Sequence, residues 1–379
     1  MHLLWFNLAT DTDDAALGFT TSWIRAVAER VTRIHVVTMR LGRFDLPENV
    51  RVYSVGKERG YGIPRRVGRF YHHLVHILRS ERVDACFSHM MPAFTVLSAP
   101  LLRPMRVPIV TWYAHPKVTA TLRAAHHVSD RMVTSLPGAY RYRKDKLEVI
   151  GQGIDVAHFS PRTSELGEWG ALGESNEPPM ILCAGRLSPV KDHKTLLRAV
   201  ALLRENYEDF QLAILGSPAR PSDNAYVESL ETLVKELRLE ENVRFHPAAA
   251  IEEMPDWYRR ATLHVNLTAA GFGDKVALEA MACGIPSLVA NRDFAETLGG
   301  LCDRLLFSPG DSADLSRRLR SILVLPGDAR IEIGRSLREQ ILCFHSLTAL
   351  AGRLVDLFKQ LRRAEAPLPG RDPESDSGN

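Results

Sequence analysis

The stretch Gly271-Phe-Gly-Asp-Lys-Val-Ala-Leu-Glu-Ala-Met-Ala-Cys-Gly284 decides the fold of this chain. Two glycines open it, and the residues after them have the pattern of a short helix, with Asp274 as the predicted N-cap and Gly284 as the predicted C′ residue. The apolar run 261–267 just before it is short and partly β-branched, which favours a buried strand. A strand, a glycine loop and a helix in this order bring free backbone N–H groups up to a phosphate.

Glu279 lies in the second turn of the predicted helix and carries a negative charge. Because a carboxylate repels a phosphate, Glu279 is expected to accept hydrogen bonds from sugar hydroxyls that lie beside the phosphate. A site that takes phosphate and hydroxyls together predicts a nucleotide-linked sugar as its ligand.

Length and composition indicate two globular domains. The chain has 379 residues, of which 45% are hydrophobic, and this content excludes wholesale disorder. No apolar run approaches the roughly 18 residues that a membrane span needs, and residues 1–8 have the pattern of a first strand, not of a signal peptide. The 5 cysteines are scattered without metal-ligand spacing, which predicts reduced thiols in the cytoplasm.

The charge is distributed unevenly along the chain. Residues 1–164 carry 23 Lys and Arg against 13 Asp and Glu, whereas the remaining residues carry 25 against 32. A basic first half favours an acidic partner: an anionic membrane surface, a diphosphate-linked lipid or a nucleic acid. The densest basic stretch contains Arg65, Arg66, Arg69 and Arg79, with Tyr61, Phe70 and Tyr71 among them. It is either a solvated helix face or a surface that binds a membrane or an acceptor.

Short apolar runs alternate with helical patterns in both halves of the chain. Strands are predicted at 3–8, 34–38, 50–55, 85–89, 107–113, 131–135 and 147–150, and again at 180–184, 210–215, 242–245, 262–267 and 286–290. This alternation predicts an α/β fold with two tandem Rossmann-like, doubly wound domains, whose ligand lies in the cleft between them. The predicted boundaries are 1–164 for the N-terminal domain, 165–179 for a linker, 180–345 for the C-terminal domain, 346–365 for a helix that crosses back onto the first domain, and 366–379 for a disordered tail.

The stretch Ala184-Gly-Arg-Leu-Ser-Pro-Val-Lys191 follows a predicted strand and precedes a predicted helix. Arg186 and Lys191 are cations near a strand end at the expected cleft, where a departing diphosphate needs counter-charge. Cations in loops often point only into water, but their occurrence together with the 271–284 stretch favours a donor site.

Two histidines follow predicted strands of the first domain. His115 is expected to hydrogen-bond a sugar hydroxyl or to shuttle a proton, although a structural role beside Trp112 and Tyr113 is equally consistent with the sequence. His89 ends its own strand in the same way and is an acceptor-side candidate with a weaker claim.

The loop after the first predicted strand holds three aspartates and ends near Gly18. Loops at this place usually touch the ligand in doubly wound folds, so Asp14 and Gly18 are acceptor-side candidates, with helix capping as the alternative. His72 and His76 have metal-ligand spacing on a predicted helix, but no third ligand stands beside them, and no metal site is predicted.

Together these motifs resemble those of a GT-B glycosyltransferase of family 4, the large retaining group. The stretch Val149-Ile-Gly-Gln-Gly-Ile-Asp155 with Phe159 is similar to the family's hinge between its two domains, with Gln152 in the place of an asparagine. The resemblance covers nearly the whole chain. It implies a two-domain GT-B fold, transfer without a metal ion, and retention of the anomeric configuration.

The resemblance also implies roles for individual residues. Arg186 and Lys191 would bind the donor diphosphate, Glu279 would bind the donor ribose, and His115 would lie beside the donor sugar. The predicted catalytic set is His115, Arg186, Lys191 and Glu279. The predicted donor-binding set is Gly185, Gly271, Phe272, Gly273, Asp274, Lys275, Val276 and Glu279, and the acceptor-side set is Asp14, Gly18 and His89.

Two departures from the family pattern matter. The first glutamate of the family's Glu-x7-Glu motif falls at Gly271, where Asp274 or Lys275 is a candidate replacement. The family's Gly-Gly loop after the first strand is absent, and only Gly18 is nearby. The first departure leaves the identity of the donor sugar open, and the second does the same for the acceptor-side loop.

The sequence thus predicts a transferase that moves a hexosyl group from a UDP- or GDP-linked sugar to a hydroxyl of a glycan or lipid-linked saccharide, with no cofactor. Cell-surface polysaccharide or glycoconjugate biosynthesis is the expected setting, in the cytoplasm or peripheral at the inner membrane face. A sugar-nucleotide epimerase of the same fold and a non-catalytic partner protein are the alternatives, and the epimerase would need paired carboxylates that the sequence does not offer. Nucleic acid is not a predicted partner, because only 61–79 approaches a continuous basic and aromatic face.

Overall fold

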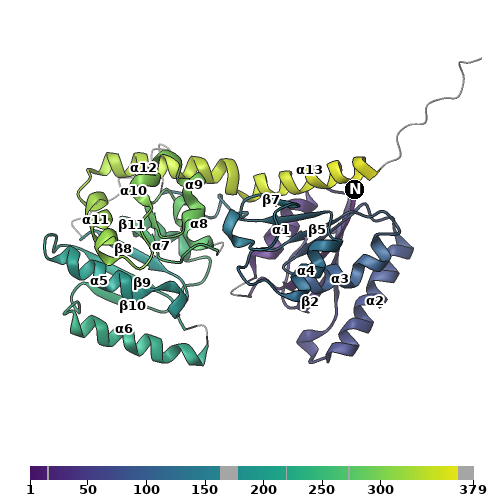
Figure 1. Cartoon of the computed structure of the whole chain (residues 1–379), viewed down its shortest axis with the longest axis horizontal. Coiled ribbons are helices and arrows are strands. Elements are labelled where there is room, and N and C mark those ends of the chain that lie inside the picture. The colour runs from purple at the N-terminus through teal and green to yellow at the C-terminus, as the bar shows by residue number, and fades with distance from the viewer. Residues whose placement is uncertain (15–16, 163–177, 219, 272–273, 366–379) are drawn as a thin grey trace, which may run out of the picture.

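The computed structural model describes residues 1–14, 17–162, 178–218, 220–271 and 274–365. It contains two parallel β-sheets with helices around them, one sheet in each half of the chain (Figure 1). This is the predicted α/β fold with two Rossmann-like domains. Most of the predicted linker 165–179 and the whole predicted tail 366–379 lie outside the described residues, as do Phe272 and Gly273 of the predicted donor loop.

The first sheet has seven parallel strands in the order β3-β2-β1-β4-β5-β6-β7. The strands are β1 (His2–Thr10), β2 (Arg33–Leu41), β3 (Val50–Ser54), β4 (Ala85–His89), β5 (Ile109–Trp112), β6 (Arg131–Thr134) and β7 (Leu147–Val149). Between them lie the helices α1 (Phe19–Ala28), α2 (Ile63–Ser80), α3 (Pro92–Leu102) and α4 (Ala120–Val128). Strand β1 is an interior strand, where Leu3 pairs with Ile34 of β2 and with Ala85 of β4.

Alternate residues of β1 point to opposite faces of this sheet. Leu3 and Trp5 belong to a buried cluster that includes side chains of α1 and of the last helix, α13 (Leu347–Glu365). Leu4 and Phe6 belong to a second cluster that includes side chains of α2 and α3. Since helices cover both faces, the first half of β1 is apolar without alternation, as is typical of a parallel strand buried on both sides.

The second sheet has five parallel strands in the order β10-β9-β8-β11-β12. They are β8 (Met180–Ala184), β9 (Gln211–Leu215), β10 (Val243–His246), β11 (Leu263–Asn266) and β12 (Ser287–Val289). The helices of this domain include α5 (His193–Arg204), α6 (Asn224–Glu236), α7 (Met254–Arg260), α8 (Lys275–Ala282), α9 (Ala295–Leu298), α10 (Cys302–Leu305), α11 (Ser312–Leu323) and α12 (Gly327–Gln340). A strand, β11, therefore precedes the 271–284 stretch and a helix, α8, lies within it, as the sequence predicts, and β11 pairs with β8 and β12.

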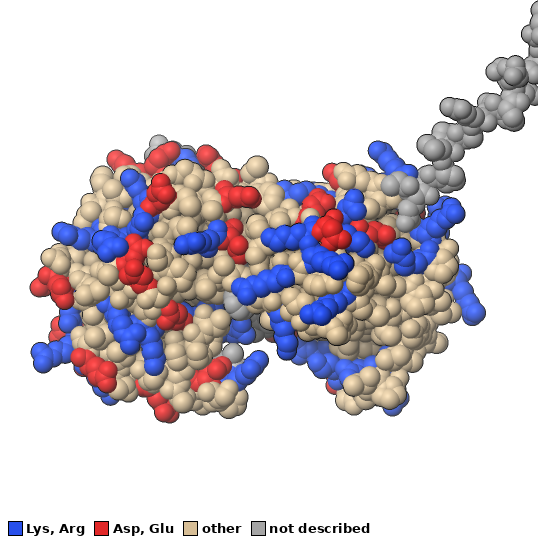
Figure 2. Space-filling view, viewed as in Figure 1, with Lys and Arg blue, Asp and Glu red and all other residues tan. Residues whose placement is uncertain are grey.

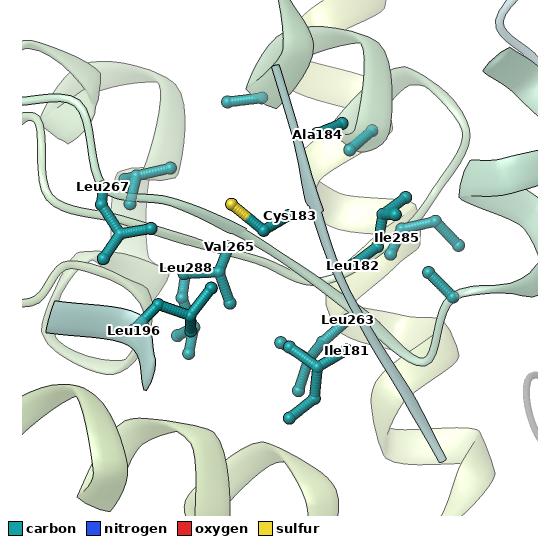
Figure 3. Packing of buried hydrophobic residues seen from close by; sticks show 14 of the residues in the cluster. Ile181, Leu182, Cys183, Ala184, Leu196, Leu263, Val265, Leu267, Ile285 and Leu288 are labelled. Carbon is teal, nitrogen blue, oxygen red and sulfur yellow. The ribbon is translucent and has the colours of Figure 1, made fainter. Parts of the chain in front are cut away.

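The core of the second domain forms where the central strands meet their covering helices. Ile181 and Leu182 of β8 lie beside Leu263 and Val265 of β11, and Leu196 of α5 packs nearby (Figure 3). All five side chains are fully buried. Burial of this kind stabilises a fold by about 1.5–3 kcal/mol for each large aliphatic side chain, so this cluster fixes the strand ends that carry the site.

The chain returns to the first domain at its end. After α12 it passes through a π-helical turn, Ile341–His345, into α13, which runs along the first domain (Figure 1). Leu350, Leu354 and Phe358 of α13 are buried against α1 and the first sheet. This is the crossover helix of the predicted fold.

A hinge segment, residues 150–159, lies against this turn where the two domains join. The backbone N–H of Ile154 donates to the His345 carbonyl at 2.7 Å, and that of Leu347 donates to the Ile154 carbonyl at 2.8 Å. Gly153 has a positive φ of 71°, and a Cβ there would lie 2.7 Å from Nε1 of Trp23 in α1. Glycine is therefore required where the hinge passes over α1.

The contact of α13 with the first sheet is expected to control the stability of the first domain. Phe358 is fully buried and its ring centroid lies 6.0 Å from that of Phe87 in β4. Phe358→Ala should therefore lower the free energy of unfolding by about 3–5 kcal/mol, measured by urea denaturation. The exposed neighbour Lys359→Ala is the control and should change it by less than about 0.5 kcal/mol.

Candidate functional site

The loop after strand β8 carries the first two cations of the site, Arg186 and Lys191. Gly185 follows the last residue of β8 with a φ of 141°, and Arg186 comes next with an exposed side chain. Among the described residues, no hydrogen bond or ion pair engages the Arg186 guanidinium. Lys191 ends the short 3-10 helix Pro189–Lys191 and turns back toward β8, since a Cβ on Gly185 would lie 3.6 Å from its Cε. The strand end thus offers one unpartnered cation and one inward-facing cation.

Lys191 is engaged by Asp274. Its Nζ lies 2.6 and 2.8 Å from the two carboxylate oxygens of Asp274, and Nδ2 of Asn266 donates to Oδ2 of Asp274 at 2.8 Å. Burial alone raises the pKa of Asp274, but Lys191 and the hydrogen bond from Asn266 outweigh it and hold that pKa below its usual value. Asp274 is therefore ionised at neutral pH and forms a buried pair with Lys191.

The pair corrects one expectation from the sequence. Asp274 does precede the first residue of α8, but its side chain makes no capping hydrogen bond. A buried ammonium needs a counter-charge, and leaving it unpaired would cost more than the roughly 1 kcal/mol that a cap contributes. Asp274 therefore pairs with Lys191 instead of capping α8.

The end of α8 has the predicted form. Gly284 has a φ of 76°, its N–H donates to the Met281 carbonyl at 3.0 Å, and the N–H of Ile285 donates to the Ala280 carbonyl at 3.1 Å. These two bonds make a Schellman motif with Gly284 at C′. The motif fixes the length of α8 and with it the position of Glu279.

Glu279 is buried, with 7% of its surface exposed. Its Oε2 accepts a hydrogen bond from the hydroxyl of Tyr258 in α7 at 3.2 Å. Burial raises the pKa of Glu279, and Lys275, one turn earlier on α8, opposes this rise. A buried carboxylate with a raised pKa beside a cation and a phenol is the type of group that binds a ligand hydroxyl.

His115 lies in the loop after β5 and is exposed. The backbone N–H of Lys117 donates to Nδ1 of His115 at 3.1 Å, so the neutral ring carries its proton on Nε2. Burial of part of the ring, with the nearby charge of Lys117, lowers the pKa of His115. The ring is therefore neutral at pH 7 and suited to donate one hydrogen bond from Nε2.

His89 ends β4, as predicted, but lies beneath the surface, with 1% of its area exposed. The rings of Phe19, Trp23 and Trp112 surround it at centroid distances of 5.7, 5.0 and 6.0 Å. Burial, and then the charge of Lys275, lowers the pKa of His89 to about 3. Neither of its ring nitrogens has a partner among the described residues. Its acceptor-side role stays a prediction.

Asp14 does not cap α1, whose N-cap position is Gly18 without a side-chain hydrogen bond, and instead binds within the loop after β1. Its Oδ1 accepts from the N–H of Leu17 at 2.9 Å, its carbonyl accepts from that of Gly18 at 2.8 Å, and its carboxylate pairs with Arg40. A Cβ on Gly18 would lie 2.7 Å from the Thr12 carbonyl oxygen, so the turn requires glycine there. These contacts hold the loop that leads into α1.

Two contacts join the domains at the donor loop. The Nζ of Lys275 lies 3.8 Å from the ring centroid of Phe19, the first residue of α1. Nη2 of Arg141, in the loop after β6, donates to the Ala270 carbonyl at 2.7 Å. Lys275 is thus directed at an aromatic ring of the first domain, as in other cation–π contacts.

A cavity of about 890 Å3 opens at the same edge of the second sheet, beside α7. It is lined by Leu215 at the end of β9, by His246 at the end of β10, and by Trp257, Arg259 and Arg260, among others. The Trp257 ring lies 4.8 Å from His246 and has the Arg260 guanidinium 4.4 Å from its centroid. An aromatic face with a cation on it is suited to stack a planar base.

Sequence reasoning missed Tyr258, Asn266, Phe19 and Arg141. Each acts on a residue that the sequence did single out, and each comes from a different element. Asn266 could have been singled out from the sequence, because it ends the strand before the donor loop. Among the described residues, no three His, Cys, Asp or Glu side chains form a group that could hold a metal ion, and no helix is long and apolar enough to cross a membrane.

Comparisons with known proteins agree with this class of fold. Two tandem Rossmann-like domains with a C-terminal crossover helix form the architecture called GT-B. Residues 170–340 match the family described as "Glycosyl transferases group 1". This match covers the second domain, and curated relatives described as glycosyltransferases are similar to part of the chain.

Curated relatives align over part of the chain. A D-inositol 3-phosphate glycosyltransferase of Streptomyces scabiei is 31% identical over 156 residues, which are 40% of this chain and 35% of that protein. A phosphatidyl-myo-inositol mannosyltransferase of Propionibacterium freudenreichii subsp. shermanii is 31% identical over 242 residues, 59% of this chain and 57% of that protein. The chain thus spans between about a third and somewhat more than half of these relatives.

Solved structures share the whole fold. A sucrose-phosphate synthase of Thermosynechococcus elongatus has a TM-score of 0.74 at 18% identity, covering 96% of this chain and 100% of that one. Anabaena HepE in complex with UDP has a TM-score of 0.73 at 17% identity, covering 95% and 100%. At such identity these structures establish the two-domain fold alone.

The raised pKa of Glu279 predicts how stability depends on pH. Ionisation is less favourable in the folded than in the unfolded protein, so wild-type stability should fall as pH rises from about 4.5, the usual carboxyl value, through the raised folded pKa. Glu279→Gln removes this dependence and should be more stable than wild type at pH 7 but not at pH 4. Urea unfolding at pH 4, 5.5 and 7 measures the difference, and an equal gap at all three values would contradict it.

Proposed function

We propose that the protein is a GT-B glycosyltransferase that moves a hexosyl group from a UDP- or GDP-linked sugar to a hydroxyl. The observation that carries this is the buried Glu279 with its partner Tyr258 on the same sheet edge as the unpartnered Arg186. A nucleoside diphosphate needs both a hydroxyl acceptor for its ribose and cations for its phosphates. The relatives named as glycosyltransferases support the same activity.

The diphosphate would bind to Arg186, to Lys191 and to the backbone N–H groups at the start of α8, where Lys275 and Val276 are the first helical residues. The helix dipole adds a stabilisation of about 0.3–1 kcal/mol. Lys191 would share its charge between Asp274 and the diphosphate, which gains charge as it leaves. Because Arg186 and Lys191 supply counter-charge, we propose that no metal ion is needed for transfer.

The base and the sugar would extend in opposite directions from the diphosphate. The cavity beside α7 offers the Trp257 ring to a base, in keeping with ligands that bind beyond the carboxyl ends of parallel strands. The sugar would point toward the first domain, where neutral His115 can donate from Nε2 to a hydroxyl. We assign the reaction to the retaining family 4, with the acceptor attacking on the face that the diphosphate leaves.

The acceptor is proposed to be a glycan or a lipid-linked saccharide, as in cell-surface polysaccharide or glycoconjugate biosynthesis. One relative is named for phosphatidyl-myo-inositol, a membrane lipid, which supports an acceptor at a membrane, whereas another is named for D-inositol 3-phosphate, which has no lipid tail. A cytoplasmic enzyme, peripheral at the inner membrane face, would meet both substrates.

Helix α2 is the proposed membrane contact. It contains no Asp or Glu, and of its arginines Arg65 and Arg79 are exposed. Ile63 at its start is 68% exposed. In Figure 2, Lys and Arg predominate over the first domain, whereas charges of both signs mix over the second. A basic helix with an exposed apolar tip is suited to an anionic lipid surface.

The donor site is tested by thermal denaturation with UDP, GDP and their hexose conjugates, without metal. One nucleotide at about 100 times its Kd should stabilise wild type by about 2.7 kcal/mol. Glu279→Ala should remove that stabilisation, whereas Glu296→Ala, on an exposed surface of α9, should not. Absence of any stabilisation at millimolar nucleotide would refute the donor site.

The membrane contact is tested by sedimentation with vesicles of phosphatidylglycerol or phosphatidylcholine. Each basic residue near an anionic surface contributes about 1 kcal/mol, so Arg65→Ser with Arg79→Ser should weaken binding to phosphatidylglycerol by about tenfold or more. The matched control is Arg198→Ser with Arg320→Ser, two exposed arginines of the second domain. Equal binding to both lipids, or equal loss in both double variants, would rule out α2 as the contact.

A further inference from the structure

Gly271 of the second domain and Arg141 of the first domain lie next to each other where the two domains meet. Gly271 has a φ of 105°, a conformation that side chains rarely adopt. A Cβ on it would lie 2.4 Å from Nη2 of Arg141 and 3.0 Å from both Cζ and Nε. The guanidinium therefore lies over the Gly271 backbone, in the space that a side chain at position 271 would fill.

Arg141 is held in this position from both sides. Its Nη2 donates to the Ala270 carbonyl at 2.7 Å. The preceding residue, Tyr140, is fully buried, and its hydroxyl pairs with Nδ1 of His126 at 2.8 Å, while Nε2 of His126 pairs with Asp145 at 3.0 Å. A loop anchored by a buried side chain presents its neighbour with little loss of conformational freedom, which favours a binding role.

The guanidinium keeps most of its hydrogen-bonding capacity. It has five N–H donors, and the Ala270 carbonyl is its hydrogen-bond acceptor in the described part of the chain. No carboxylate of the described residues forms an ion pair with it. The two carboxylates of this region are otherwise engaged: Asp274 by Lys191, and Asp293 by the N–H of Gly271 at 3.0 Å. Arg141 is exposed and available to an anion.

The order of ribose, diphosphate and sugar along the donor indicates which donor group carries the anion that would bind Arg141. This step rests on the proposed function. The ribose lies at Glu279 and the diphosphate at Arg186, Lys191 and the start of α8. Gly271 lies before that start, and Arg141 approaches it from the first domain. The donor group that reaches Arg141 is therefore the sugar.

We propose that Arg141 is a specificity-determining residue that selects a sugar carrying a carboxylate, so that the donor is a nucleoside-diphosphate hexuronic acid. A guanidinium binds a carboxylate through two parallel hydrogen bonds, which a neutral hydroxymethyl group cannot match. The carboxylate at C6 of a hexuronic acid supplies the partner that the protein does not provide.

The test compares donors that differ only at C6. Titration calorimetry on the full chain, without acceptor, measures the Kd of UDP, UDP-glucose and UDP-glucuronate, and of GDP, GDP-mannose and GDP-mannuronate. Wild type should bind one uronate conjugate about tenfold or more tightly than its neutral counterpart. Arg141→Met should remove this preference and leave the Kd of the nucleotide alone within about twofold, and Arg141→Lys should retain part of it.

Each contrary result has a distinct meaning. Arg143→Met, on an exposed residue of the same loop, should keep the wild-type preference, and thermal denaturation should report a folded protein for both Met variants. Equal or tighter binding of the neutral conjugate by wild type overturns the uronic acid while leaving the donor site intact. A loss of affinity for the nucleotide alone in Arg141→Met makes Arg141 a diphosphate ligand and overturns its role in specificity. Failure of every nucleotide to bind refutes the donor site and this inference together.

Discussion

The buried ion pair between Lys191 and Asp274 is the interaction on which the site depends. Both side chains are nearly enclosed, with 13% and 12% of their surfaces exposed, so each charge is stable there only because the other neutralises it. The pair connects the loop after β8 to the start of α8 and, through Asn266, to the end of β11. It therefore fixes the start of α8, where the proposed diphosphate would bind, while the Arg186 guanidinium has no hydrogen-bond or ion-pair partner among the described residues.

The chain passes between the domains twice, through the hinge segment and through the π-helical turn before α13. These two connections determine the position of the first domain relative to the site. The hinge and the π-helical turn before α13 exchange backbone hydrogen bonds at Ile154, and Arg338 of α12 donates to the Phe159 carbonyl at 3.0 Å. These bonds hold the two passages to each other, and α13 packs on α1 beside them. The position of Phe19 over Lys275 and of Arg141 over Gly271 follows from this arrangement, far from the passages themselves.

The strands, the helix that carries Glu279 and its C′ glycine were predictable because they depend on local pattern. Apolar runs alternating with helical spacing specify a parallel sheet, and Gly284 meets a backbone requirement that only nearby residues impose. Asp274 holds the predicted N-cap position, but its side chain does not cap α8, because capping preference is local, whereas the charge of Lys191 comes from 83 residues away. No sequence pattern indicates Arg141, because it contacts the donor loop only once the two domains have docked.

The glycine at position 271 gains a physical explanation from that docking. A family member with glutamate there carries its recognition group on the donor loop, within one domain. In this chain the loop has no side chain at that point, and the group that fills the space belongs to the first domain. In the proposed donor site, recognition of the sugar requires both domains to be in contact, since separating them would withdraw Arg141 and Phe19 but leave Lys191, Asp274 and Glu279 in place. The proposed nucleotide half of the site is thus built within one domain, and its sugar half is completed only where the two domains meet.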